Sequence, residues 1–394
     1  MAFSSGILSA SLLALAVLLP RPDGAHAAQQ PIKIGFVGEL SGPQGALGQD
    51  QYDGFMLLVE RNGGKLGGYP VEILKEDSQL KPEVGIQAVR KLMERDNVPI
   101  ITGITFSNIM MAVHKLVTDK EVFLIGSNAG PSPIAGAACS PYQFIVSWQQ
   151  DSLAEVFGEY SNQQGYERVY LMAPNFQAGK DFLAGFKRTF NGEVAAEAYT
   201  PLNQLDFSAE LTQLSAAKPD AVFVFYPGGL GVNFVSQYRQ AGLMDIPLMS
   251  GGIADTTVLA ALQDSALGIM GSFPWGPDLD NEANREFMAE FEKKYERIPS
   301  PFAANGYDSA QLLDSAIAKV NGDVGDKKAF MAALKAADFA SVRGDFRFGP
   351  NHFPIQDYHV QKVAKDERGR VNVRTIATPF KARADSYASQ CPLE

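Results

Sequence analysis

Short apolar runs alternate with amphipathic segments along the chain from Ile32 to about Phe273. The runs are continuous rather than alternating in polarity, which is typical of parallel strands buried on both faces. We predict strands at residues 32–37, 71–75, 99–102, 122–125, 168–173, 220–225, 246–249 and 268–273. Between them, residues 82–95, 181–190, 208–216, 231–241 and 281–295 have helical apolar spacing. Strands that alternate with helices predict an α/β fold with doubly wound parallel sheets.

The alternation breaks at two places. Polar residues interrupt it near 142–151, and a segment rich in proline and aspartate interrupts it near 271–280. After Val342 the pattern changes to short β signals. A chain of 394 residues is too long for one compact core. We therefore predict two lobes joined by several crossings. Lobe 1 comprises residues 28–147 plus 277–350, and lobe 2 comprises 148–276 plus part of 351–394.

The N-terminal segment has the pattern of an export signal. Residues 7–19 form an apolar run that ends at Pro20, and Ala25-His26-Ala27 gives the small-x-small pattern of a cleavage site. No Lys or Arg precedes the run, which is atypical. The alternative is a membrane anchor, but the run is shorter than the roughly 20 residues that span a bilayer. We predict a cleavable signal peptide at residues 1–27.

The composition limits the partners. The net charge is −10, which argues against nucleic acid or an anionic membrane surface. A small anionic ligand is still compatible with this negative net charge, because backbone dipoles at helix starts can outweigh the mean charge.

The chain has two cysteines, Cys139 and Cys391. In an exported chain an even number of cysteines predicts a disulfide, here a single one. Two buried free thiols are the alternative. A bridge closing so long a loop would stabilise the fold by about 4–5 kcal/mol.

Catalytic signatures are scarce in this sequence. It contains no nucleophile elbow, no H-E-x-x-H or C-x-x-C motif and no phosphate-binding loop. Beyond the predicted signal the histidines are His114, His352 and His359. We therefore predict a binding protein rather than an enzyme, with no cofactor and no metal. A secreted α/β hydrolase and the sensing domain of a receptor are the alternatives.

The loops after the predicted strands offer binding chemistry. In open parallel sheets, ligands bind at the carboxyl ends of the strands, where loops lead into helix starts. Two such loops, residues 105–108 and 127–132, carry hydroxyl, amide and small residues that suit a carboxylate. Ordinary helix capping is the alternative role for these residues. Other strand ends carry aromatic residues, which can line a pocket or stack on a ring.

Five segments together resemble periplasmic binding proteins of the branched-chain amino acid (leucine/isoleucine/valine) transporter type. They are residues 32–48, the loop 63–70, and residues 71–78, 218–222 and 303–310. The resemblance covers essentially the whole chain after the signal. It implies a two-lobe type I fold that closes on a small solute in the periplasm and delivers it to the permease subunits of an ABC transporter. We expect a monomer.

The departures from the amino-acid binders concern the ligand. The resemblance implies that two loops bearing Ser or Thr hold the α-carboxylate, yet here Phe106 intrudes and Gly130 stands where a threonine is expected. The glutamate that binds the ligand's ammonium group is replaced by the turn Ser250-Gly251-Gly252-Ile253. A buried ammonium without a counter-charge would cost several kcal/mol. Residues 105–108, Trp148 and residues 174–180 are instead similar to a subgroup that takes aromatic acids.

Our hypothesis is that the ligand is a small carboxylate, aromatic and benzoate- or cinnamate-like. The ring would lie between four aromatic residues (Phe106, Trp148, Phe176 and Tyr226). Ile253, in the turn that has no glutamate here, is also expected to contact the ligand. The carboxylate would be held by Ser107, Asn128 and the backbone of Ala129 and Gly130. We place Trp148 at the mouth of the cleft; packing under the crossing segment is its alternative. A branched-chain or other amino acid is the alternative ligand.

Overall fold

The first sheet is built from the N-terminal part of the chain. The computed structural model describes residues 1–3 and 30–393, so the predicted signal peptide lies outside the described residues apart from its first three. Strand order is β2-β3-β1-β4-β5-β6. The strands are β1 (Ile32–Gly38), β2 (Lys65–Leu66), β3 (Tyr69–Asp77), β4 (Ile100–Gly103), β5 (Phe123–Gly126) and β6 (Gln143–Ile145). Strand β1 pairs in parallel with both β3 and β4, as the continuous apolar runs predicted.

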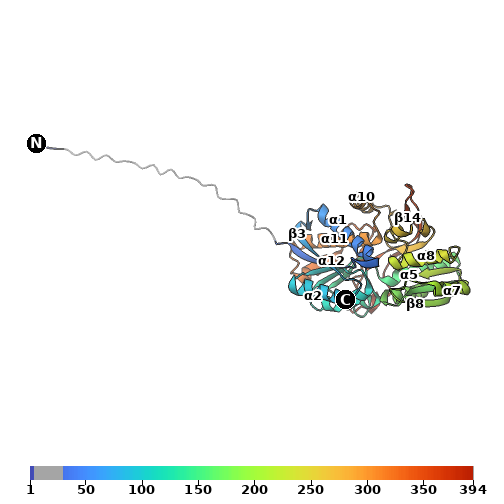
Figure 1. Ribbon diagram of the computed structural model, residues 1–394. Coiled ribbons are helices and arrows are strands. Elements are labelled where there is room, and N and C mark those ends of the chain that lie inside the picture. Colours follow the sequence, from blue (N-terminus) through green and yellow to red (C-terminus); the bar gives the residue numbers. More distant parts are fainter. Residues whose placement is uncertain (4–29, 394) are drawn as a thin grey trace. The chain divides into compact units, whose positions relative to one another are not determined.

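Helices cover this sheet. They are α1 (Gly45–Arg61), α2 (Pro82–Arg90), α3 (Ser107–Thr118), α4 (Ser132–Ala135), α10 (Glu282–Tyr295), α11 (Pro301–Lys319) and α12 (Lys327–Ala336). A π-helical turn, Lys91–Arg95, continues α2. Helices α1 and α11 lie side by side (Figure 1) because glycines permit it. A Cβ atom at Gly54 would overlap the carbonyl oxygen of Ala303, and one at Gly306 would overlap that of Gln51.

The second sheet has the order β12-β13-β11-β10-β9-β7-β8, with β14 paired to β13. Its strands are β7 (Arg168–Pro174), β8 (Glu193–Thr200), β9 (Ala221–Val224), β10 (Leu248–Ser250), β11 (Met270–Phe273), β12 (Arg347–Phe348), β13 (Pro354–Lys365) and β14 (Val371–Arg383). Helices α5 (Gln150–Gln164), α6 (Gln177–Thr189), α7 (Ser208–Ala217), α8 (Gly229–Gln240) and α9 (Thr256–Leu262) accompany it. Strands β7 to β11 are parallel, and β13 is antiparallel to β11.

The α/β fold with two doubly wound, mostly parallel sheets is confirmed. The C-terminal part differs from the prediction of short β signals, because β13 and β14 form a long antiparallel hairpin of 12 and 13 residues. Charged residues such as Arg374 interrupt the apolar pattern of β14, as expected for a strand with one solvated face. Within the described ranges no helix is long and apolar enough to cross a membrane.

The chain passes between the sheets several times. Residues 146–149 lead from β6 into α5, residues 274–281 lead from β11 into α10, and residues 337–346 lead from α12 into β12. The predicted lobe boundaries stay a prediction. The tail after β14 is covalently held, because Cys391 forms a disulfide with Cys139, 252 residues earlier. The predicted bridge is therefore present.

Candidate functional site

A cavity of about 30 Å³ lies where the carboxyl ends of strands from both sheets meet. Its walls come from loops after β4, β5, β7, β9 and β10, from the end of β11, from the crossing before α5, and from α1, α3, α5, α6 and α11. The lining residues are Leu47, Thr105, Phe106, Ser107, Asn128, Trp148, Gln150, Leu153, Phe176, Ala178, Phe182, Phe225, Pro227, Gly251, Gly252, Phe273 and Phe302. This is the position at which open parallel sheets bind ligands.

Aromatic rings form most of the wall. Phe225 stacks on Phe182, with ring centroids 3.9 Å apart and an interplanar angle of 10°, and Phe176 lies 6.1 Å from Phe225. A second group consists of Trp148, Phe273 and Phe302, with the indole 5.6 Å from Phe273. Aromatic side chains of this kind offer apolar surface and ring faces and edges for stacking. The cavity wall is therefore suited to an apolar, aromatic body.

The polar side chains of the wall are neutral, and the structure gives most of them protein partners. Among the described residues, no Asp, Glu, Lys or Arg lines the cavity. The Thr105 hydroxyl accepts a hydrogen bond from the Glu39 N–H at 3.0 Å. Asn128 Nδ2 donates to the carbonyl oxygen of Thr105 at 2.6 Å. Ser107 Oγ accepts from the Ala178 N–H at 3.0 Å, and a hydroxyl that accepts one bond can still donate its hydrogen.

Three helices begin at this cavity. Ser107, Gln150 and Ala178 belong to the first turns of α3, α5 and α6, and all three line it. The N-cap residues of these helices make no side-chain capping hydrogen bond in the described structure. A helix start carries about half a positive elementary charge and unpaired N–H groups. These helix starts therefore favour an anion in the cavity although its lining side chains are neutral.

Five of the predicted ligand-binding residues meet at this cavity: Phe106, Ser107, Asn128, Trp148 and Phe176. They come from four separate segments, and the predicted strand ends bring them together. Trp148 lies deeper than the predicted cleft mouth, because its side chain is only 3% exposed and packs against Phe273 and Phe302.

Tyr226 and Ile253 lie away from the cavity, in the core on the other side of the second sheet. The Tyr226 ring packs against Phe207 and Phe234, and its hydroxyl lies 3.2 Å from that of Thr200. Successive residues at a strand end point to opposite faces, so the preceding residue, Phe225, lines the cavity instead.

The backbone of Ala129 and Gly130 does not line the cavity either. The Ala129 N–H already donates to the carbonyl oxygen of Ile104 at 3.0 Å. Gly130 is needed for packing, because a Cβ atom there would overlap the carbonyl oxygen of Trp148. Its own carbonyl accepts from the Gln150 N–H at 3.0 Å. These two residues shape the crossing segment, and Ser107 and Asn128 are the polar groups of the two loops that reach the cavity.

Sequence reasoning missed several wall residues. Phe182 lies on a predicted helix, and its place in an apolar stripe made it look like ordinary core. Phe302 follows Ser300, whose hydroxyl accepts from the N–H groups of Phe302 and Ala303 and so starts α11. Gln150 belongs to the polar interruption near residues 142–151, which was interpreted only as a break between lobes. The signal that could have identified Gln150 as a site residue was its position in the first turn of a helix that follows a crossing between the sheets.

Two buried acids lie near this region without lining the cavity wall between the sheets. Asp255, the first acid after the Ser250–Ile253 turn, is 1% exposed and caps α9 by accepting from the Thr257 N–H at 2.9 Å. Burial raises the pKa of Asp255 to about 7, and the nearby Asp50 carboxyl adds to the shift. Burial also raises the pKa of Asp50 to about 6, although Arg297 opposes this by pairing with it. Neither acid can serve as a counter-charge inside the cavity.

Polar contacts join the two sides of the cavity. Besides the bond from Ala178 to Ser107, the N–H and hydroxyl of Ser132 donate to the Asp181 carboxylate on α6 at 3.0 and 2.7 Å. Burial and, to a smaller extent, the Asp151 carboxyl raise the pKa of Asp181 to about 6. Because α3 and α4 belong to the first sheet's side and α6 to the second's, these bonds hold the cavity closed.

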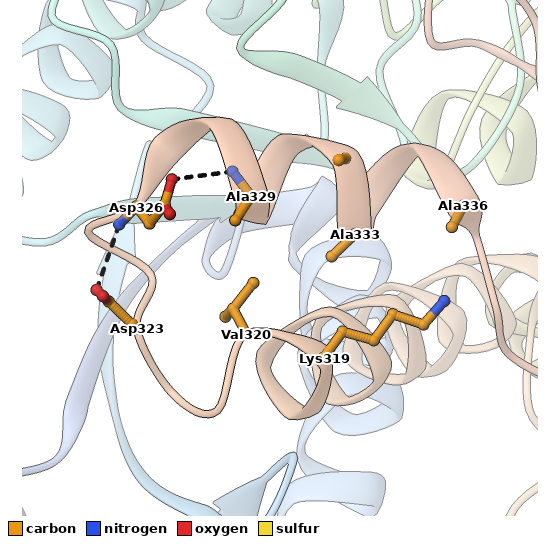
Figure 2. Close-up of a pocket in the computed structure, with 8 residues that line it drawn as sticks. Lys319, Val320, Asp323, Asp326, Ala329, Ala333 and Ala336 are labelled. Carbon is orange, nitrogen blue, oxygen red and sulfur yellow. Dashed lines mark hydrogen bonds between the residues drawn. The ribbon is translucent and has the colours of Figure 1, made fainter.

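Another hollow, at the surface, offers less binding chemistry. Figure 2 shows a surface hollow of about 360 Å³ between the end of α11 and α12. Its acids are engaged in the turn: Asp326 caps α12 by accepting from the Ala329 N–H, and Asp323 accepts from the Asp326 N–H. In the residues that the structure describes, no group of His, Cys, Asp and Glu is placed to hold a metal ion.

Sequence comparison identifies the class. A profile of the family described as "Periplasmic binding protein" matches residues 31–368, so the chain belongs to that family. It is 26% identical over 389 residues to the Leu/Ile/Val-binding protein homolog 6 of Brucella melitensis, covering 95% of this chain and 97% of the relative.

Solved structures agree with the fold. A solute-binding protein of an ABC transporter from R. palustris, in complex with benzoate, is 30% identical with a TM-score of 0.88, covering 92% of this chain and all of that one. Another, from Rhodopseudomonas palustris HaA2 in complex with p-hydroxybenzoic acid, is 26% identical with a TM-score of 0.84, covering 91% and 99%. The predicted family and two-lobe binding-protein fold are confirmed. The protein is a solute-binding protein of the ABC transporter type.

Proposed function

We propose that the protein captures a small aromatic monocarboxylate in the periplasm and delivers it to the permease subunits of its transporter. The observation that carries the proposal is the cavity wall. Seven aromatic side chains line it, and within the described residues none of its lining side chains is charged. Its role is binding rather than catalysis, and we expect it to act as a monomer.

The carboxylate is best accommodated at the start of α3. The Ser107 hydroxyl can donate to it, and the unpaired N–H groups of the first turn and the helix dipole favour an anion there. The starts of α5 and α6 reinforce this preference from the same cavity. The Asn128 amide, anchored on Thr105, lies in the adjacent loop. This assignment keeps Ser107 and Asn128 from the sequence-based hypothesis and omits the backbone of Ala129 and Gly130.

The ring of the ligand would lie between the two aromatic groups. Phe176, Phe182 and Phe225 form one wall, and Trp148 with Phe273 forms the other. A cavity of about 30 Å³ is smaller than a benzoate ring, so the walls must separate when the ligand enters. Rotation of the lobes about the crossing segments would break and re-form the hydrogen bonds from Ala178 to Ser107 and from Ser132 to Asp181.

An amino acid fits this wall less well. Its ammonium group would be buried without an acidic partner among the described lining residues, at a cost of several kcal/mol. It would also face the positive ends of helix dipoles. The benzoate and p-hydroxybenzoate complexes of the R. palustris proteins support the aromatic acid, whereas the names of the Brucella relatives favour the amino acid.

Thermal unfolding in the presence of candidate ligands tests the proposal. Benzoate or cinnamate at a hundredfold excess over the Kd should stabilise the protein by about 2.7 kcal/mol, which raises Tm by a few degrees. Leucine and valine should leave Tm unchanged. Calorimetric titration of Trp148→Ala should show aromatic-acid binding weakened by about 1–3 kcal/mol. Stabilisation by leucine or valine without any effect of the aromatic acids would refute the proposal.

A further inference from the structure

The side chain of Gln150 is an unusual member of the cavity wall. It stands in the first turn of α5 and is only 7% exposed. Its Oε1 atom is fully buried and accepts no hydrogen bond from any residue in the ranges 1–3 and 30–393. The other polar side chains of the wall, the buried Thr105 and Ser107 and the partly buried Asn128, each have a protein partner.

A buried, unpaired carbonyl oxygen is costly. It loses its hydration and gains nothing in return, which costs about 1–3 kcal/mol unless a ligand supplies the missing donor. The ionised carboxylate of the ligand cannot supply it, because a carboxylate only accepts hydrogen bonds. A phenolic hydroxyl on the ring can donate, and it can do so without adding a charge to the cavity.

We propose that Gln150 is a specificity-determining residue that accepts a hydrogen bond from a ring hydroxyl, so that the preferred ligands are hydroxybenzoate-like acids. This inference rests on the proposed function, because it requires the ring of an aromatic acid in the cavity. The carboxylate is held at the α3 start, and the hydroxyl satisfies the Gln150 oxygen on α5. A site that hydrogen-bonds a substrate hydroxyl discriminates strongly against the analogue that lacks it.

Calorimetric titration of the purified, ligand-stripped protein with benzoate, 3-hydroxybenzoate and 4-hydroxybenzoate tests this role. The wild-type protein should bind at least one hydroxybenzoate about 10- to 100-fold more tightly than benzoate. Gln150→Met, which preserves side-chain length, should reduce that ratio to about one, because hydroxybenzoate binding should weaken more than benzoate binding. Gln150→Leu should behave in the same way and serves as the second variant should the first fail to fold.

Gln149→Met is a matched control. Gln149 is 1% exposed, and its Oε1 is likewise buried without a partner in the described structure, but it does not line the cavity. This variant should keep the wild-type ratio. Equal loss of benzoate and hydroxybenzoate in Gln150→Met would mean that the amide holds the carboxylate, and would overturn the inference. Equal wild-type affinities for all three acids would overturn it and leave the proposed function standing. Binding of none of them would refute both.

Discussion

A buried ion pair between Arg343 and Asp308 ties the crossing segments together. The guanidinium is 1% exposed and the carboxylate 0% exposed. Arg343 donates from Nε and Nη2 to Asp308 Oδ2 at 3.0 and 2.9 Å. Its Nη1 donates to the carbonyl oxygens of Val146 and Ser147 at 2.6 and 3.0 Å, and to Gln356 at 2.8 Å. One side chain therefore holds α11, the crossing before Trp148 and the start of β13.

Replacing Arg343 with methionine should destabilise the protein strongly. The Asp308 carboxylate would keep its bonds from Ser341 and Val342 but would lose its counter-charge inside the core. The Val146 carbonyl would lose a charged donor, whereas Ser147 would keep its bond from Gln356. Removal of one partner of a buried pair costs about 3–5 kcal/mol. We expect a loss of this size in the free energy of unfolding.

Guanidinium chloride unfolding, followed by fluorescence and circular dichroism, measures this loss. Arg285→Met is the control, because the Arg285 side chain is 61% exposed and pairs with Asp280 at the surface. It should cost less than 1 kcal/mol. In a double-mutant cycle, Arg343→Met combined with Asp308→Leu should lose about 1–3 kcal/mol less than the sum of the single losses. A loss below 1 kcal/mol for Arg343→Met, or additive effects in the cycle, would refute the reasoning.

Three further predictions concern a buried acid, the disulfide and one strand end. The raised pKa of Asp255 means that its contribution to stability is present below pH 4 and is lost as the pH rises through about 7. Asp255→Asn keeps the capping oxygen and removes the ionisable group. It should therefore raise Tm relative to wild type at pH 8, where the buried carboxyl is ionised, and much less at pH 5. Equal shifts in Tm at both pH values would contradict this. Replacing Cys139 and Cys391 with serine should lower the free energy of unfolding by about 4–5 kcal/mol, and thiol titration of the denatured wild-type protein should detect no free thiol. Phe225→Ala should weaken aromatic-acid binding by about 1–3 kcal/mol in calorimetric titrations. Tyr226→Phe should change the affinity by less than twofold and should lower the free energy of unfolding by about 1 kcal/mol. If Tyr226→Phe weakened binding and Phe225→Ala did not, Tyr226 would belong to the binding site and Phe225 would not.

Much of the fold could be predicted because its sequence signals are local. Continuous apolar runs marked the parallel strands, and an initial proline with an apolar stripe marked α2. The hairpin of β13 and β14 was underestimated because β13, besides pairing with its sequence neighbour β14, pairs with β11, which lies far earlier in the sequence. Strands of this kind depend on neighbours that a local pattern does not reveal.

The candidate site could be predicted only as a set of strand ends. The rule that ligands bind at the carboxyl ends of parallel strands selected the loops of Phe106, Asn128 and Phe176. It could not tell Phe225 from Tyr226, because adjacent residues point to opposite faces and a shift of one residue exchanges them. Phe302 was beyond reach for another reason, because α11 reaches the cavity only through packing against α1.

The polar part of the site shows most clearly what a linear pattern lacks. Hydroxyl and amide residues near helix starts were visible in the sequence, but their hydrogen-bonding state was not. The Ala129 N–H looked available and is bound to Ile104, whereas Gln150 looked like a solvated neighbour of Trp148 and has a buried oxygen without a partner in the described structure. Binding chemistry depends on which groups folding leaves unsatisfied, and that is decided by tertiary contacts. For this reason the neutral, aromatic character of the ligand site followed from residue types, while the group that would select among aromatic acids emerged only from the packed structure.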